Sequence, residues 1–124
     1  VDENLKKYNL KSHDVKGDGN CQYRALAYQM GLQNGEEDHD IVRHIVVEEM
    51  KENPDRYIEF DAEFASESDS SGVSWEEYLE KFKVTSGENV IWGNNLTLQA
   101  AANAFERTIT VVQDADNPIT RVRA

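Results

Sequence analysis

The chain has one cysteine, Cys21, which follows the turn-forming stretch Gly17-Asp18-Gly19-Asn20. Residues 21–30 have the composition of a helix, so the thiol is expected at a helix N-terminus, where unpaired amides carry partial positive charge. Such a charge favours the thiolate, the nucleophilic form of cysteine. Glycine lets the loop backbone approach a substrate closely, and amides of the turn can donate to an oxyanion. The local residues leave two interpretations open: a nucleophilic cysteine, or a buried cysteine after an ordinary tight turn.

Neither calcium nor zinc is expected at this loop. Residues 14–20 resemble a calcium-binding loop faintly, but Lys16 stands at the third position and Ala25 at the twelfth, where such a loop needs oxygen ligands. The single cysteine and the three separated histidines lack the spacing of zinc ligands. We therefore predict no metal site and no cofactor.

The chain is strongly acidic, with 24 aspartates and glutamates against 13 lysines and arginines and a formal net charge of −11. Nucleic acid and anionic membranes are not expected as partners, because both are bound by basic faces. The acidity either keeps the protein soluble or attracts a partner with a basic face. The lone cysteine, with no signal peptide and no long apolar run, predicts an intracellular location, in the cytoplasm or the nucleus.

The length of 124 residues fits one domain over residues 1–124. Apolar spacing and capping signals predict helices over residues 4–10, 21–30, 36–53, 74–82 and 96–105. Two β-branched stretches, 108–113 and 119–122, predict an antiparallel hairpin with a turn at 114–118. The acidic, serine-rich residues 61–72 are predicted to form an exposed loop. Because a two-stranded sheet is marginal by itself, we expect the domain to continue beyond residue 124.

One hydrophobic core is expected beneath these elements. Trp75 should belong to it, because its helical spacing matches that of apolar residues downstream. Trp92 lies in a loop, and its position is equally compatible with a buried core residue and with a residue that recognises a partner. Helix 21–30 is expected to pack against strand 108–113. The predicted core residues are Leu26, Ile41, Ile45, Val46, Leu98, Ala101, Phe105, Ile109 and Val111.

Three segments of the chain have a specific order and spacing. The first is Gly17 to Cys21 followed by Arg24-Ala25, and the second is the amphipathic stretch 41–57. The third is Trp92-Gly93-Asn94-Asn95-Leu96-Thr97-Leu98-Gln99-Ala100. Together they resemble the ovarian-tumour (OTU) family of cysteine proteases: its nucleophile motif, the helix after it, and its Trp-Gly-Gly-x-x-Glu-Leu-x-Ala stretch. Asn94 and Thr97 depart from that last pattern, and the likeness extends over nearly all of the chain from Val15.

The resemblance implies an α/β (α+β) class and the papain-like OTU fold, with a small central sheet flanked by helices. It implies a thiol-dependent deubiquitinase that hydrolyses isopeptide bonds at the C-terminus of ubiquitin or a ubiquitin-like protein, with ubiquitin or polyubiquitin chains as partners. Cys21 would be the nucleophile and Asp18 a second catalytic residue. Asp18, Gly19, Asn20 and Cys21 would form the oxyanion hole. The channel for the ubiquitin tail would be bordered by Trp92, Gly93, Asn94 and Asn95.

In that family the general base is a histidine on a final strand, and this sequence has no corresponding segment. His13 precedes the nucleophile loop, and His39 and His44 lie on the helix predicted over 36–53. Each of them suits a surface or core-edge position better than the role of a base. Without a base, an ordinary thiol is mostly protonated at neutral pH. Three accounts stay open: a sequence that ends early, a base supplied by another chain, or a non-catalytic ubiquitin-binding module.

Overall fold

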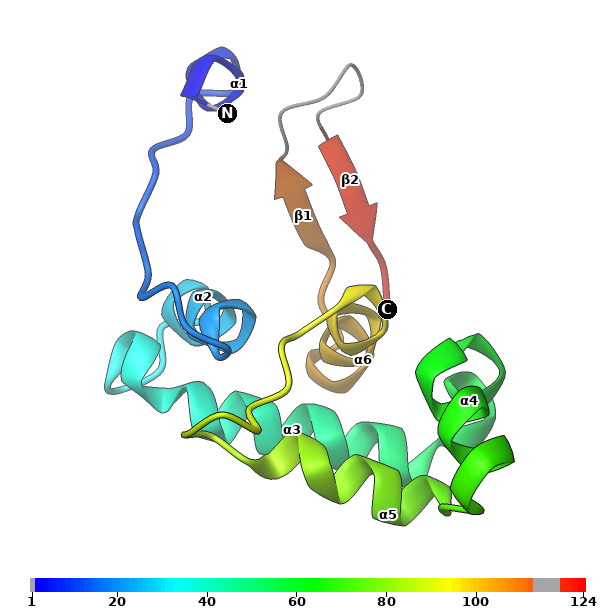
Figure 1. Cartoon of the computed structure of the whole chain (residues 1–124). Helices are drawn as coiled ribbons and strands as arrows, with labels where there is room; N and C mark the ends of the chain where they lie inside the picture. Colours follow the sequence, from blue (N-terminus) through cyan, green and yellow to red (C-terminus); the bar gives the residue numbers. More distant parts are fainter. Residues whose placement is uncertain (1, 113–118) are drawn as a thin grey trace.

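A computed structural model of the chain describes residues 2–112 and 119–124. Six α-helices and two strands are formed by the described residues, and four short 3₁₀-helices connect some of them (Figure 1). The mixed helical and antiparallel content confirms the predicted α+β class. The helices and strands are α1 (Asp2–Lys7), α2 (Cys21–Gln29), α3 (His39–Glu52), α4 (Ala62–Ser71), α5 (Trp75–Glu80), α6 (Asn95–Phe105), β1 (Ile109–Val112) and β2 (Ile119–Val122). The 3₁₀-helices are η1 (Gly35–Asp38), η2 (Pro54–Arg56), η3 (Ile58–Phe60) and η4 (Lys81–Lys83).

Helix α3 is the centre of the fold, and α2, α5 and α6 pack against it. Its buried apolar residues are Val42, Val46, Val47 and Met50, which recur at helical spacing. The prediction that Ile41 belongs to the core is wrong, because its side chain is 47% exposed. Apolar residues surround much of this helix, so periodicity alone did not identify the face that turns inward.

The predicted core is correct in part. Val46 and Ala101 are core residues, and Leu26, Phe105 and Ile109 pack against the core from partly buried positions. Ile45, Leu98 and Val111 are only half-buried and lie outside this cluster. Trp75 is buried as predicted, and its indole N–H donates to the carbonyl oxygen of Met50 at 2.8 Å.

Residues 62–71 form helix α4, which corrects the prediction of a loop over 61–72. Asp61 caps the helix, since its side chain accepts a hydrogen bond from the backbone N–H of Phe64 at 3.0 Å. Gly72 ends it in the left-handed region, with φ of 70°. The ring of Phe64 meets that of Trp75 edge-on, with 4.9 Å between centroids. The cap at Asp61 and the contact of Phe64 with Trp75 therefore stabilise a helix here, although the serine-rich composition favours a loop.

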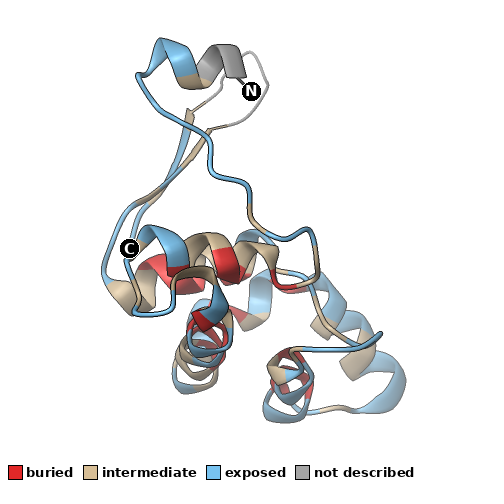
Figure 2. Cartoon of the chain, turned by 90° about the vertical axis from the view of Figure 1, so that its left-hand side faces the viewer, coloured by how far each residue is buried: buried red, intermediate tan, exposed pale blue. Residues whose placement is uncertain are grey.

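The two strands form the predicted antiparallel hairpin, in which Ile109 pairs with Val122 and Val112 with Ile119. The turn predicted at 114–118, and residue 113, lie outside the described residues. The prediction that α2 packs against β1 is wrong: α2 packs mainly against α3 and η1, whereas β2 contacts α6. In the described residues the hairpin stands at the edge of the helical body (Figure 1). Its strand residues are half-buried or exposed (Figure 2).

No helix among residues 2–112 and 119–124 has the length and apolar character needed to cross a lipid bilayer. Ahead of α2 the chain is extended from residue 10 to residue 17, and α1 lies away from the helical body (Figures 1 and 2).

Candidate active site

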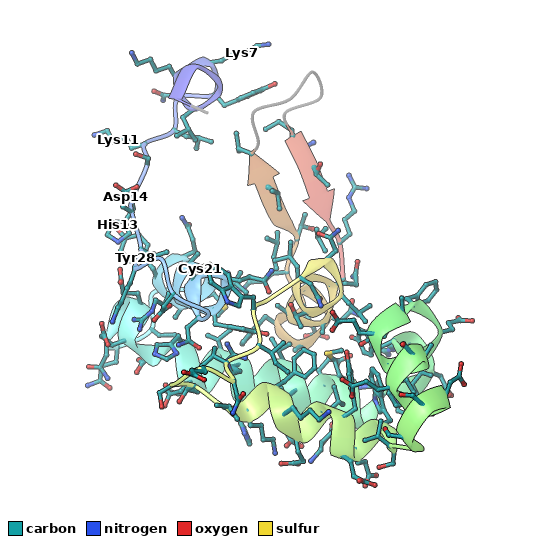
Figure 3. All side chains as sticks on the ribbon, in the orientation of Figure 1. Lys7, Lys11, His13, Asp14, Cys21 and Tyr28 are labelled. Atoms are coloured by element: carbon teal, nitrogen blue, oxygen red, sulfur yellow. The ribbon has the colours of Figure 1, made fainter. Side chains whose placement is uncertain are left out.

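Cys21 is the first residue of α2 and is half-buried. Asn20 precedes it as the helix N-cap, and its side chain makes no capping hydrogen bond, because that side chain is held elsewhere. The Cys21 thiol makes no hydrogen bond with any residue that the structure describes. The predicted nucleophile therefore stands at a helix N-terminus, as the sequence indicates (Figure 3). No described side chain that could act as its general base is hydrogen-bonded to it.

Asp18 closes the turn that leads into α2. Its carboxylate accepts from the Asn20 N–H at 3.0 Å, and its carbonyl accepts from the Cys21 N–H at 3.1 Å. Arg24, one turn along α2, donates to both carboxylate oxygens at 3.2 and 3.0 Å. The hydrogen bonds from Arg24 lower the pKa of Asp18 from 3.8 to about 2. The Asp18 carboxylate is thus an anion that fixes the shape of the loop.

The backbone amides predicted to form an oxyanion hole differ in their partners. Those of Asn20 and Cys21 donate to Asp18, and that of Asp18 donates to the carbonyl of Lys16. The Gly19 amide donates to no described residue. A β-carbon on Gly19 would stand 2.5 Å from Cγ1 of Val90, so only glycine fits there.

The side chain of Asn20 is 97% buried and bridges two other segments. Its amide nitrogen donates to the carbonyl of Thr85 at 2.9 Å, and its oxygen accepts from Arg43 at 2.8 Å. Arg43 is a residue of the site that the sequence reasoning missed. The available signal was a guanidinium on the apolar face of an amphipathic helix, next to Val42 and one turn before Val46 and Val47.

Trp92 is 58% exposed, so the structure favours recognition over burial for this residue. Its indole Nε1 would be 3.3 Å from a β-carbon on Gly19, which puts the tryptophan beside the nucleophile loop. Gln22, the residue after Cys21, donates to the carbonyl of Asn94 at 3.1 Å and accepts from the Thr97 hydroxyl at 2.8 Å. The start of α2 and the residues around Trp92 are therefore joined.

The two departures from the OTU pattern, Asn94 and Thr97, form a reciprocal capping pair at the start of α6. The Asn94 side chain accepts from the Thr97 N–H at 2.9 Å, and the Thr97 hydroxyl accepts from the Asn94 N–H at 2.8 Å. A threonine in place of glutamate thus still satisfies the N-cap amide. Asn95 is exposed at the first position of α6.

A groove of about 390 Å³ runs between the nucleophile loop and the segment before α6. Asp18, Gly19, Asn20 and Trp92 line it, whereas Cys21, Gly93, Asn94 and Asn95 do not. The predicted oxyanion and channel residues are therefore brought together only in part. The remaining lining residues are Lys16, Arg24, Thr85, Ser86, Gly87, Glu88 and Val90.

None of the three histidines forms a hydrogen bond with Cys21 among the described residues. His13 stacks on Tyr28 with 3.7 Å between ring centroids, and its Nε2 lies 3.4 Å from Glu36 (Figure 3). His39 begins α3, where burial first and the Arg24 charge second lower its pKa. His44 lines a separate hollow along the outer side of α3. Within the described part of the chain, no group of three histidine, cysteine or carboxylate side chains could hold a metal ion.

Comparison with known proteins identifies the family. The OTU-like cysteine protease family matches residues 16–123. Three proteins of Arabidopsis thaliana are similar, and all are named ovarian tumor domain-containing deubiquitinating enzymes. Enzyme 10 is 36% identical over 87% of this chain, enzyme 11 is 37% identical over 87%, and enzyme 12 is 34% identical over 89%.

The aligned part of this chain spans 26%, 38% and 43% of the lengths of those three relatives, respectively. The family match includes the nucleophile loop, α3 and the Trp92 segment, the same segments that carry the resemblance in the sequence. The chain belongs to the OTU-like cysteine protease family.

Proposed function

We propose that this chain carries the nucleophilic half of a deubiquitinase active site, with Cys21 as the nucleophile. The observation that carries the proposal is the position of Cys21: it stands at the start of α2, directly after a loop that Asp18 fixes. Residues 18–20 of that loop line a groove together with Trp92. Family membership supports a cysteine protease, and the names of the relatives support ubiquitin as the substrate.

In the proposed reaction the Cys21 thiolate attacks the carbonyl carbon of the isopeptide bond at the C-terminus of ubiquitin or a ubiquitin-like protein. The carbonyl oxygen becomes an oxyanion, to which the Gly19 amide can donate, since among the amides of residues 18–21 it alone has no acceptor in the described residues. The carbon–nitrogen bond breaks, and the substrate amine leaves with a proton from the base. Water then hydrolyses the thioester, which restores the thiol and releases the ubiquitin carboxylate.

The groove beside Gly19 and Trp92 suits an extended, glycine-ended tail in this proposal. Val90 already approaches Gly19 closely, so a substrate segment with bulky side chains has little room at that end. Trp92 offers an apolar, half-exposed wall, and Gly93 to Asn95 continue the border outside the groove. An intracellular location remains a prediction, which cell fractionation tests.

The general base is proposed to come from outside these 124 residues, because His13 pairs with Glu36 and no hydrogen bond joins Cys21 to His39 or His44 among the described residues. The same observation favours a second candidate, a ubiquitin-binding module without catalysis. A free imidazole can substitute for a missing imidazole side chain, so the two candidates differ in their response to it.

The test uses ubiquitin with an electrophilic C-terminus, which forms a covalent bond with a reactive thiol and is followed by intact mass. We expect slow labelling of the chain, faster labelling with added imidazole or in the full-length gene product, and none in Cys21→Ser. Ubiquitin-like modifiers with the same electrophile measure specificity. Binding of ubiquitin without labelling in any arm would favour the non-catalytic module. Rapid labelling that His13→Ala abolishes would make His13 the base.

A further inference from the structure

Arg43 is a buried cation whose hydrogen-bond acceptors are all uncharged. Its side chain is 1% exposed, and among the described residues no carboxylate forms an ion pair with it. Burial lowers its pKa, and its Nε hydrogen has no described partner. Taking a guanidinium out of water costs several kcal/mol, and an apolar side chain of similar size would avoid that cost. A stabilising role in the core therefore does not account for an arginine at this position.

The acceptors of Arg43 belong to three separate segments that meet at the site. One terminal nitrogen, Nη1, donates to the carbonyls of Phe82 at 2.7 Å and Ile91 at 2.8 Å. The other, Nη2, donates to the carbonyl of Gly19 at 3.1 Å and the side-chain oxygen of Asn20 at 2.8 Å. The guanidinium thus ties the nucleophile loop to η4 and to the residue before Trp92, which forms the opposite wall of the groove.

The peptide group between Gly19 and Asn20 is held from both sides. Arg43 binds its carbonyl oxygen, and the Asp18 carboxylate accepts from its N–H at 3.0 Å. A peptide with both polar atoms occupied is prevented from turning over. The guanidinium carbon also lies 4.2 Å from the ring centroid of Tyr23, two residues after the nucleophile. Both flanks of Cys21 therefore contact the same side chain.

We propose that Arg43 is a positioning residue for Cys21, which keeps the nucleophile loop at a fixed orientation and distance from the Trp92 wall of the groove. It acts through Gly19, Asn20 and Tyr23, and it does not itself reach the substrate. The inference deepens the proposed function and rests on it, since fixed spacing across the groove matters for catalysis only if Cys21 attacks a bound carbonyl.

The test compares Arg43→Lys, which keeps the charge but loses the planar fork, with Arg43→Met, which keeps much of the apolar stem. Cys21 reactivity is measured as the rate of alkylation by iodoacetamide across a range of pH. Hydrogen exchange of the Asn20 and Cys21 amides, which both donate to Asp18, is measured by NMR on the same samples. Arg56→Met, at an exposed arginine paired with Glu49, is the matched control.

We expect both Arg43 variants to alkylate more slowly than the wild type, by about tenfold or more, because a lysine cannot reach acceptors in three segments. Amide protection should fall at residues 20 and 21 and persist in α3 and α6. Arg56→Met should match the wild type in both measurements. A merely structural role would instead lower protection throughout the core and leave the pH profile of alkylation unchanged.

If an Arg43 variant does not fold, Asn20→Ala replaces it in the test. This substitution removes the hydrogen bond between the Asn20 side chain and Arg43 and leaves Arg43 itself unchanged. It should reproduce the slower alkylation. Unchanged alkylation and exchange in folded Arg43→Met and in Asn20→Ala would overturn the inference and leave the proposed function standing. If the wild type never reacts with the ubiquitin probe while these variants alter alkylation as expected, the proposed function fails and the positioning of the Cys21 loop by Arg43 holds.

Discussion

The side chain of Gln22 occupies the space in which a β-carbon of residue 93 would stand. That atom would lie 2.8 Å from Cβ of Gln22, which is too close for any real contact. Gln22 is anchored there by its hydrogen bonds to Asn94 and Thr97, so it cannot swing aside without losing them. Gly93 is therefore required by the approach of α2 to the start of α6.

Gly93→Ala should lower the stability of the domain by about 1–3 kcal/mol, the usual cost of overpacking. Urea denaturation followed by circular dichroism measures the change. Gly17→Ala is the matched control, because a β-carbon there meets nothing within 4 Å. If the two variants were equally stable, the close contact between Gln22 and residue 93 would be refuted.

The ion pair of Asp18 and Arg24 should make stability depend on acid pH. The pKa of Asp18 is lowered to about 2 in the folded state, chiefly by hydrogen bonds from Arg24. A lowered pKa means that the carboxylate stabilises the folded state in full above the unfolded value of 3.8 and stops doing so as the pH falls through about 2.

Asp18→Asn should accordingly be less stable than the wild type at neutral pH, and the difference should shrink as the pH falls from about 4 to about 2. Denaturation curves at a series of pH values measure it. Asp14→Asn is the control, since Asp14 is exposed and forms no ion pair with a described residue. A difference that stays constant down to the lowest pH would argue against the pair.

The capping pair at α6 predicts that Thr97→Val is destabilising by about 1 kcal/mol. Valine keeps the shape of threonine but leaves the Asn94 N–H without its acceptor and Gln22 without a donor. Thr108→Val, at an exposed position before β1, should have little effect. Thermal unfolding of both variants gives the comparison, and equal melting temperatures would contradict the role of the hydroxyl.

Asp61 has two roles, and the same carboxylate oxygen serves both. Its carboxylate caps α4 and accepts from the Tyr78 hydroxyl at 3.1 Å. Burial first, and then the Asp61 charge, raise the pKa of Tyr78. Asp61→Ala should cost about 2 kcal/mol, because it removes a cap and leaves a buried hydroxyl without its acceptor. Both hydrogen bonds are accepted by the same oxygen, Oδ1, which Asp61→Asn retains, so this variant should cost clearly less in the same denaturation experiment. Equal losses would rule out the hydrogen bonds as the cause.

The sequence identified those features of the site that depend on neighbouring residues. The position of Cys21 at a helix start follows from local spacing, and so does the start of the helix predicted over 74–82, where the Ser74 hydroxyl accepts from the Glu77 N–H at 3.2 Å. The hairpin of β1 and β2 was also predictable, because β-branched residues fill both strands. These features require no knowledge of distant contacts.

What the sequence did not reveal depends on contacts between distant segments. The acceptors of Arg43 lie 23 to 48 residues away in the chain, so no local pattern indicates that its guanidinium is buried. Helix α4 is a different case: its cap at Asp61 and its end at Gly72 are local, and only the contact of Phe64 with Trp75 depends on another helix. The orientation of α3, which exposes Ile41, is likewise set by the elements around it.

The hairpin of β1 and β2 has a bearing on how the protein behaves at high concentration. Each strand has only one neighbouring strand in the described residues, and the edge of a two-stranded sheet can template pairing between copies. The net charge of −11 opposes such association through mutual repulsion. That repulsion fades near the isoelectric point of about 4.6. Colloidal stability should therefore be poorest in mildly acidic buffer, and acid elution during purification should favour fibrous or gelled aggregates.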